Sequence, residues 1–197
     1  MFLRRVKIKQ PIEFIIAGLG NPGDKYFHNR HNVGFMCIDY ISQKENIKVN
    51  KIKFRSVVGE GEIGGHRVLL LKPQTFMNLS GEAIREAANF YKIPSTNIIV
   101  IHDDINLDVG ILRIKRKGSD GGQKGMKNII AQLSTEDFPR LKIGVGMPPP
   151  EIEMIQWVTG DIPKADHEAV FKVIENSYEA IKLIIDGKID TAMNKYN

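Results

Sequence analysis

Residues 14–23 read Phe-Ile-Ile-Ala-Gly-Leu-Gly-Asn-Pro-Gly, and this stretch decides the fold class. The short apolar run from Phe14 to Leu19 is typical of a buried strand. Residues 20–23 follow it as a turn, because glycine and proline interrupt regular structure. The next apolar residues, in 33–41, recur at helical spacing. The chain therefore begins its fold with a buried strand, a tight turn and a helix.

Strands and helices continue to alternate along the rest of the chain. Periodicity predicts further helices within 84–91, 126–133 and 170–184, with Ser80 as the N-cap of the first and an end near Gly187 for the last. It predicts strands at 97–102, 110–115 and 141–145, and a hairpin of 56–63 and 66–71 that turns at Gly64-Gly65. This alternation predicts an α/β sandwich around a largely parallel sheet with one hairpin.

Length and composition exclude several classes of protein. The 197 residues fit one domain, and 42% hydrophobic with 26% charged residues is ordinary globular composition. No apolar run, 14–17 and 98–101 included, exceeds four residues, which is too short to cross a bilayer, and no signal-peptide core follows the basic first residues. Cys37 is the only cysteine, so no intrachain disulfide can form. We expect a protein of the reducing cytoplasm.

The positive charge is concentrated in one segment. Residues 113–127 hold six basic residues against one acid, a local charge of +5 that equals the net charge of the whole chain. Residues 151–197 hold nine acids and five bases. This asymmetry suggests a polyanion that binds at one edge of the molecule, although a solvated basic loop is the simpler alternative.

Two cofactor sites are conceivable and both lack support. Residues 18–23 formally match GxGxxG, with Asp39 at a suitable distance for a ribose contact. A dinucleotide site needs a helix that opens within the glycines, whereas helical periodicity begins only around Asn32. His28, His31 and the residues 102–104 could ligate a metal, but no HExxH motif or cysteine pair accompanies them. We therefore expect neither a nucleotide cofactor nor a metal.

Polar residues at strand ends suggest hydrolytic chemistry instead. Asn21 and Asp103 follow two predicted strands, and His31 lies in the loop that opens the next helix. If they meet, Asp103 can fix the tautomer of the imidazole while the other ring nitrogen takes a proton from water. No GxSxG motif is present and Cys37 lies on a core face, so water is the expected nucleophile. A purely structural His–Asp pair remains the alternative.

The glycine-rich segment 118–125 follows the basic strand. Its glycines would let the backbone approach a ligand, and the helix that starts near Gly125 offers free amides to an anion. Lys115 and Lys124 would add positive charge. The segment has no GxxxxGK[ST] pattern, so triphosphate hydrolysis is unsupported, and a flexible surface turn is the alternative.

Residues 75–81 form an apolar loop with an amide at its centre. Asn78 could donate to a substrate carbonyl while Phe76 and Met77 form an apolar wall. Alternatively, Asn78 assists in capping the helix that follows.

Taken together, these segments resemble bacterial-type peptidyl-tRNA hydrolase. The resemblance extends from about Phe14 to the C-terminus and lies in 18–23, Tyr26, 30–32, 76–81, 102–104, and Gly121-Gly122 ahead of Gly125. It implies a monomeric, single-domain α/β protein with a twisted mixed sheet flanked by helices in three layers. The implied activity is hydrolysis of the ester that joins a peptide to tRNA, which recycles tRNA when translation stalls. No metal, organic cofactor, membrane or obligate protein partner is implied.

The resemblance also assigns roles to residues. His31 would be the general base and Asp103 its orienting partner. Asn21 would bind the peptide part of the substrate, and Asn78 would hold the carbonyl or the attacking water. Tyr26 and Phe76 would line the cleft near the 3′ end of tRNA. Lys115 and Lys142 would contact tRNA phosphates.

The sequence departs from the family pattern at one place. Where the family usually has Gly-Gly-His-Asn-Gly, residues 121–125 read Gly-Gly-Gln-Lys-Gly, so that Lys124 replaces a substrate-contacting asparagine. An ammonium group only donates hydrogen bonds, so we expect Lys124 to contact a phosphate or carbonyl near the CCA end. Residues 1–12 precede the usual start and are expected to form a basic extension to a single domain, 13–197. A non-catalytic RNA-binding protein of the same fold remains the alternative function.

Overall fold

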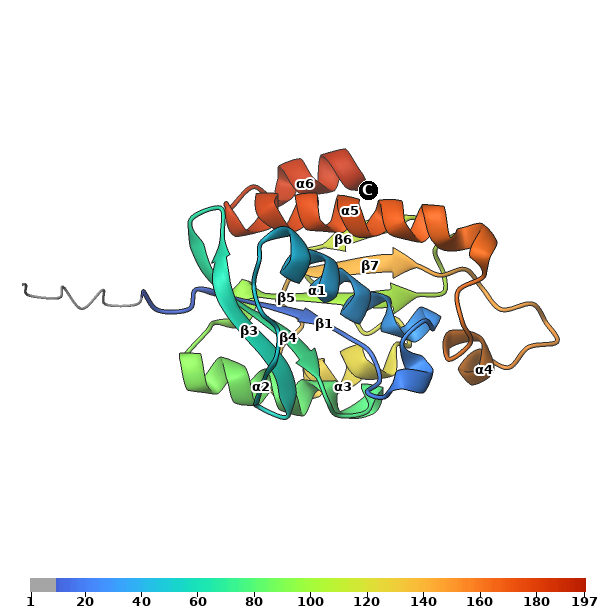
Figure 1. Ribbon diagram of the computed structural model, residues 1–197, viewed down its shortest axis with the longest axis horizontal. Coiled ribbons are helices and arrows are strands. Elements are labelled where there is room, and N and C mark those ends of the chain that lie inside the picture. Colours follow the sequence, from blue (N-terminus) through green and yellow to red (C-terminus); the bar gives the residue numbers. More distant parts are fainter. Residues whose placement is uncertain (1–9) are drawn as a thin grey trace, which may run out of the picture.

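The computed structural model describes residues 10–197, which form a sheet between two layers of helices (Figure 1). Within these residues the sheet has seven strands in the order β2-β3-β4-β1-β5-β7-β6. The strands are β1 (Phe14–Gly18), β2 (Lys51–Lys53), β3 (Ser56–Ile63), β4 (His66–Pro73), β5 (Ile98–Asp104), β6 (Leu112–Lys115) and β7 (Arg140–Gly144).

The centre of the sheet is parallel and its edges are antiparallel. β1 pairs in parallel with β4 and β5, and β5 pairs in parallel with β7. The pairs β2–β3, β3–β4 and β6–β7 are antiparallel. Because β1 and β5 are parallel neighbours, with Gly18 opposite Ile101, the segments that leave both strands emerge at the same edge of the sheet.

Helices cover both faces of the sheet. The α-helices are α1 (Val33–Lys44), α2 (Ser80–Tyr91), α3 (Lys124–Leu133), α4 (Met154–Val158), α5 (His167–Ile185) and α6 (Ile189–Tyr196). Short 3-10 helices are η1 (Asp24–Tyr26), η2 (Arg30–Asn32), η3 (Met77–Leu79), η4 (Ser95–Asn97) and η5 (Lys164–Asp166). Figure 1 shows α5 and α6 on one side of the sheet and α2 and α3 on the other.

The alternation of side chains along the strands divides the core into two parts. Ile16 packs with the buried residues of α1, α5 and α6, whereas its neighbours Ile15 and Ala17 pack with those of α2 and α3. Successive strand residues point to opposite faces, so a central strand covered on both sides must be apolar throughout. This requirement explains the uninterrupted apolar run in the sequence of β1.

Two glycines bring α1 against the end of β1. A Cβ on Gly18 would lie 2.1 Å from the carbonyl oxygen of Gly34, and a Cβ on Gly34 would lie 2.4 Å from the amide nitrogen of Leu19. Only glycine permits such a close approach of two backbones. The contact fixes the start of α1, and with it η2, against the strand ends.

The sequence-based expectations are met for the mixed α/β sheet and for the hairpin at Gly64-Gly65. The edge strand β2 and the helices α4 and α6 were not predicted, because they are short or lack a clear apolar period. Ser80 is not an N-cap: it is the first residue of α2, and its hydroxyl donates to the carbonyl of Met77. Of the expected extension 1–12, residues 1–9 lie outside the described residues, and Ile12 is buried in the core.

No helix within residues 10–197 has the length and apolar character that a membrane span requires.

The glycine contact leads to a stability prediction. Gly34→Ala places a methyl group within 2.6 Å of three backbone atoms of Leu19 and Ile101, so we expect the free energy of unfolding to fall by about 2 kcal/mol or more. Gln43→Ala, at an exposed position of the same helix, is the control and should not lower it. Urea unfolding measures both, and a Gly34→Ala variant as stable as the wild type would contradict the prediction.

Candidate active site

A cavity of about 610 Å³ opens where β1 and β5 end. Its lining comes from the β1–η1 loop, η2, η3, the end of β5, the glycine-rich loop and α4, and it includes Asn21, His31, Phe76, Met77, Asn78, Asp103, Gln123 and Lys124. Four of the predicted site residues, Asn21, His31, Asn78 and Asp103, are therefore brought together at one edge of the sheet. Phe76 and Lys124 join them at the rim, where both are exposed.

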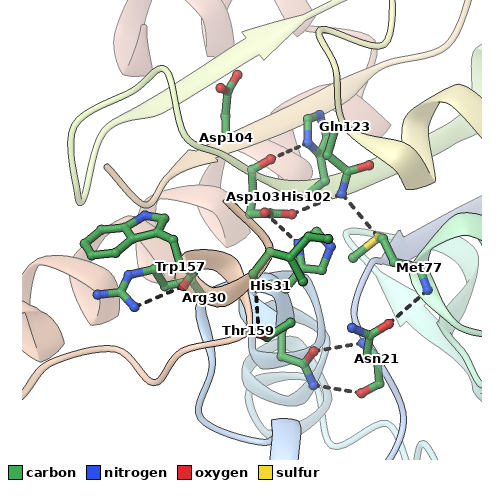
Figure 2. A network of polar contacts seen from close by, with 12 residues as sticks. Asn21, Arg30, His31, Met77, His102, Asp103, Asp104, Gln123, Trp157 and Thr159 are labelled. Carbon is green, nitrogen blue, oxygen red and sulfur yellow. Dashed lines mark hydrogen bonds and ion pairs between the residues drawn. The ribbon is translucent and has the colours of Figure 1, made fainter. Parts of the chain in front are cut away.

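His31 and Asp103 form a hydrogen-bonded pair in this cavity (Figure 2). Nδ1 of His31 lies 2.7 Å from Oδ2 of Asp103, and the two side chains are 13% and 3% exposed. A carboxylate can only accept, so Nδ1 carries the proton and donates it. Nε2 of the neutral ring is then left as an acceptor. The pair has the arrangement expected of a general base and its orienting partner.

Asp103 stays ionised despite its burial. Loss of solvent opposes the charge and would by itself raise the pKa of the carboxyl group. The charge of His31 and the hydrogen bonds from His31 and Gln123 outweigh burial, so the pKa of Asp103 lies below its ordinary value. The carboxylate therefore remains a negative, acceptor-only partner for the imidazole at neutral pH.

Gln123 is the residue of the site that sequence reasoning missed. Its Nε2 donates to Oδ1 of Asp103 at 3.0 Å, and its Oε1 accepts from the amide nitrogen of Met126 at 2.7 Å, as the N-cap of α3. The sequence contains no clear signal for this role, because glutamine, unlike asparagine, is not among the preferred N-cap residues. The cap occupies part of the helix N-terminus that had been expected to offer free amides to an anion.

Asn21 is held by neighbours on both sides. Its backbone amide donates to Oδ1 of Asn32 at 2.8 Å, and its carbonyl accepts from Nδ2 of Asn32 at 3.0 Å. The side-chain Oδ1 of Asn21 accepts from the amide nitrogen of Met77 at 2.9 Å. The group that Asn21 can offer to a ligand is therefore its Nδ2, a donor suited to a carbonyl oxygen.

A buried arginine fastens the cavity wall that α4 provides. Nη1 of Arg30 donates to the carbonyls of Trp157, Gly160 and Asp161 at 3.2, 3.3 and 3.0 Å. The guanidinium also lies 3.6 Å from the centre of the Trp157 ring. Figure 2 shows the two side chains next to each other. Arg30 directly precedes His31 in η2. Its contacts with Trp157 and the residues after it therefore connect the α4 wall of the cavity to the segment that carries His31. Neither Arg30 nor Trp157 was singled out from the sequence.

The predicted basic residues gather on one face of β6 and β7. Register places Arg113 opposite Lys142 and Lys115 opposite Arg140, and the alternating Leu141 and Ile143 enter the core on the α1–α5 side. The four basic side chains therefore point to the side of the sheet on which α3 lies. We call Arg113, Lys115, Arg140 and Lys142 the basic strip.

The members of the basic strip differ in their partners. Nζ of Lys142 forms an ion pair with Oδ2 of Asp104. Arg140 is buried and donates to the carbonyls of Gly118 and Ser119, so it holds the glycine-rich loop rather than a ligand. Lys115 is exposed at the end of β6. Like charges placed directly opposite destabilise a sheet, which favours a functional reason for the basic strip.

Two parts of the segment between β1 and α1 bear on the sequence-based expectations. Tyr26 is not among the residues that line the cavity: it lies on η1, with Nζ of Lys25 4.8 Å from the centre of its ring. The GxGxxG match at residues 18–23 is not followed by a helix that starts in its glycines, since η1 and η2 come before α1. The turn therefore lacks the helix N-terminus that a pyrophosphate requires.

The lining offers little that could replace water as the nucleophile. The described residues that line the cavity include no serine or cysteine, and the hydroxyl of Thr159 donates to the carbonyl of Ile155. Cys37 is buried elsewhere, and burial raises the pKa of its thiol. Within residues 10–197, no three His, Cys, Asp or Glu side chains are grouped so as to hold a metal ion.

A hydrogen-bonded His–Asp pair, in a cavity at the carboxyl edge of an α/β sheet, is an arrangement that suits a hydrolase. The model of the family "Peptidyl-tRNA hydrolase" matches residues 15–197. This chain belongs to that family.

Similar proteins agree over nearly the full length. The peptidyl-tRNA hydrolase of Clostridium botulinum (strain Eklund 17B / Type B) is 53% identical over 184 residues, which cover 93% of this chain and 95% of that protein. That of Caldicellulosiruptor bescii is 50% identical over 186 residues, or 94% and 97% of the two chains. The crystal structure of peptidyl-tRNA hydrolase from Acinetobacter baumannii superposes with a TM-score of 0.89 at 34% identity and covers 94% of each chain.

His102 leads to a prediction for stability at acid pH. Burial lowers the pKa of this histidine to about 4, and its Nδ1 bonds to the carbonyl of Asp103 at 2.7 Å. Between pH 6.5 and 4 the unfolded chain binds a proton at this residue that the folded chain does not. Stability should therefore fall as the pH falls through this window, by up to about 3 kcal/mol from this residue.

Thermal unfolding of the wild type and of His102→Gln between pH 7 and 4 tests this. The variant should lose less stability than the wild type over the window. An equal loss in both proteins would show that His102 does not cause the acid sensitivity.

Proposed function

We propose that this chain hydrolyses the ester bond of peptidyl-tRNA with a water molecule that His31 activates. The observation that carries the proposal is the 2.7 Å contact between Nδ1 of His31 and Asp103, in a cavity of a peptidyl-tRNA hydrolase family member. The relatives that match over nearly the whole chain bear the same name. They give no support to a non-catalytic RNA-binding protein.

The reaction follows from the direction of the hydrogen bonds. Asp103 holds the proton of His31 on Nδ1, so Nε2 takes a proton from water while the water oxygen bonds to the ester carbonyl carbon. The resulting oxyanion is stabilised by an amide donor, for which the side chain of Asn78 is available in the lining. Collapse of the intermediate breaks the bond to the ribose oxygen. This oxygen leaves with the proton from Nε2, which restores His31.

Substrate roles divide along the cavity. Nδ2 of Asn21 donates to a carbonyl of the peptide, so a blocked substrate is preferred to aminoacyl-tRNA with a free amine. Asn78 holds the ester carbonyl or the attacking water, and Phe76 provides an apolar surface at the rim for the 3′ end of tRNA.

The tRNA body binds along the basic strip and α3. Lys115 contacts phosphate at the edge strand, Lys142 does so from its ion pair with Asp104, and Lys124 contacts a phosphate or carbonyl near the CCA end. α5 and α6, which belong to the acidic segment 151–197, pack on the opposite face of the sheet, away from this path. The proposed tRNA path and the helices of the acidic segment thus lie on different sides of the sheet.

The proposal also covers the location, oligomeric state, cofactor requirement and domain organisation of the protein. The chain acts as a cytoplasmic monomer without an obligate protein partner and needs no cofactor. Residues 13–197 form a single catalytic domain, and residues 1–12 have no catalytic role. Its activity recycles tRNA from stalled translation.

His31→Ala tests the base directly. Loss of a general base should lower kcat by about 10²–10⁴-fold, with tRNA affinity nearly unchanged. The measurement is release of an N-blocked amino acid from tRNA, with free-amine aminoacyl-tRNA as the control substrate. A His31→Ala variant with wild-type turnover would refute the base, and a wild type that binds tRNA without cleaving it would favour the RNA-binding alternative.

Salt dependence tests the tRNA path. Lys115→Ala and Lys124→Asn should each weaken tRNA binding and reduce the slope of log K against log salt by roughly 0.7–0.9, the loss of one phosphate contact. Lys53→Ala removes an equal charge from β2, at the opposite edge of the sheet, and should leave the slope unchanged. A wild-type slope in Lys115→Ala or Lys124→Asn would remove that residue from the interface.

A further inference from the structure

Both oxygens of the Asp103 carboxylate are occupied by protein donors. Oδ2 faces Nδ1 of His31 at 2.7 Å, and Oδ1 accepts from Nε2 of Gln123 at 3.0 Å. A carboxylate with one fixed oxygen can still turn about its Cβ–Cγ bond, whereas one held at both oxygens cannot. Gln123 therefore supplies the second point that sets the plane of the carboxylate opposite the imidazole.

The orientation of the Gln123 amide is itself determined by its surroundings. Oε1 accepts from the amide nitrogen of Met126, a donor, and Nε2 faces Asp103, an acceptor. A flipped amide would place NH₂ against N–H and oxygen against a carboxylate, so only one orientation satisfies both neighbours. Nε2 also lies 3.2 Å from Sδ of Met77. The side chain thus joins the start of α3 to the end of β5.

We propose that Gln123 is a positioning residue of the reaction: its amide holds the Asp103 carboxylate in the plane that keeps His31 aligned for proton transfer. This inference rests on the roles proposed above for His31 and Asp103. An amide does not titrate, so the donor is present at every working pH. The titratable groups that line the cavity around it are His31, His102, Asp103, Asp104, Asp120 and Lys124.

Gln123→Glu separates positioning from capping. The introduced carboxylate retains an oxygen for the amide of Met126, and a negative charge is favourable at a helix N-terminus, so the cap should be retained. Repulsion from Asp103 should lower the free energy of unfolding at neutral pH, and by less at pH 5, where the new carboxyl is protonated. The same change replaces the donor toward Asp103 by a second carboxylate oxygen. Activity should therefore fall without a loss of folding. A residue that only caps α3 would not behave in this way.

The pH dependence of kcat shows whether the hydrogen-bond donor to Oδ1 of Asp103 has been lost. A carboxyl group beside Asp103 has a raised pKa, and while protonated it can again donate to Oδ1. At pH 7.5 we expect Gln123→Glu to lower kcat by about 10-fold or more, the range for a hydrogen bond to a charged group, with KM within about twofold. The ratio of variant to wild-type kcat should rise toward one as the pH falls from 8 to 5.

The experiment measures steady-state cleavage of N-blocked aminoacyl-tRNA and thermal unfolding for four proteins: wild type, Gln123→Glu, His31→Ala and Gln43→Glu. Gln43→Glu makes the same charge change on the exposed surface of α1 and should match the wild type. A Gln123→Glu kcat within twofold of the wild type at pH 7.5, or a loss that is equal at all pH values, would overturn the inference. If His31→Ala also keeps its activity, the proposed dyad fails as well. If His31→Ala alone is inactive, only the role of Gln123 fails.

Discussion

A buried carboxylate must have its oxygens hydrogen-bonded, and at Asp103 this requirement ties together three distant segments. The carboxylate stands at the end of β5, one oxygen faces His31 from η2, and the other accepts from Gln123 at the start of α3. Removing a partner from a buried charge costs several kcal/mol, so the three segments are energetically coupled at this point. The arrangement that stabilises the charge also presents Nε2 of His31 to the cavity as an acceptor.

The arrangement of the backbone brings these segments close to one another. Parallel pairing of β1 with β5 places Asn21 and Asp103 at the same edge, and the contact of Gly18 with Gly34 brings η2 to that edge. Arg30, which precedes the base, then binds the α4 segment and closes one wall of the cavity. On the other side, buried Arg140 holds the glycine-rich loop, so this loop is organised by the protein and not a free surface turn. Catalytic and substrate-binding parts thus share the same supports.

The sequence predicts the scaffold and the acid–base pair for clear physical reasons. Apolar runs mark β1 and β5, strand ends carry Asn21 and Asp103, and the local charge of 113–127 includes two members of the basic strip, Arg113 and Lys115. The contacts of the site that the sequence does not predict depend on the tertiary structure. Neither the bond from Gln123 to Asp103 nor the stacking of Arg30 on Trp157 can be found from spacing, because the partners are 20 and 127 residues apart. Tyr26, to which the resemblance assigned a place near the 3′ end of tRNA, lies on η1 outside the cavity lining, and this role stays a prediction.

The direction of the His31–Asp103 hydrogen bond is the central claim, and ¹⁵N NMR of the imidazole measures it most directly. In ¹⁵N-histidine-labelled protein, with His31→Ala used to assign the signals, a neutral His31 ring should carry its proton on Nδ1 and have an unprotonated Nε2. This tautomer is the one that can accept a proton from water. A neutral His31 with its proton on Nε2 would contradict the account, because the ring could then neither donate to Asp103 nor act as the base.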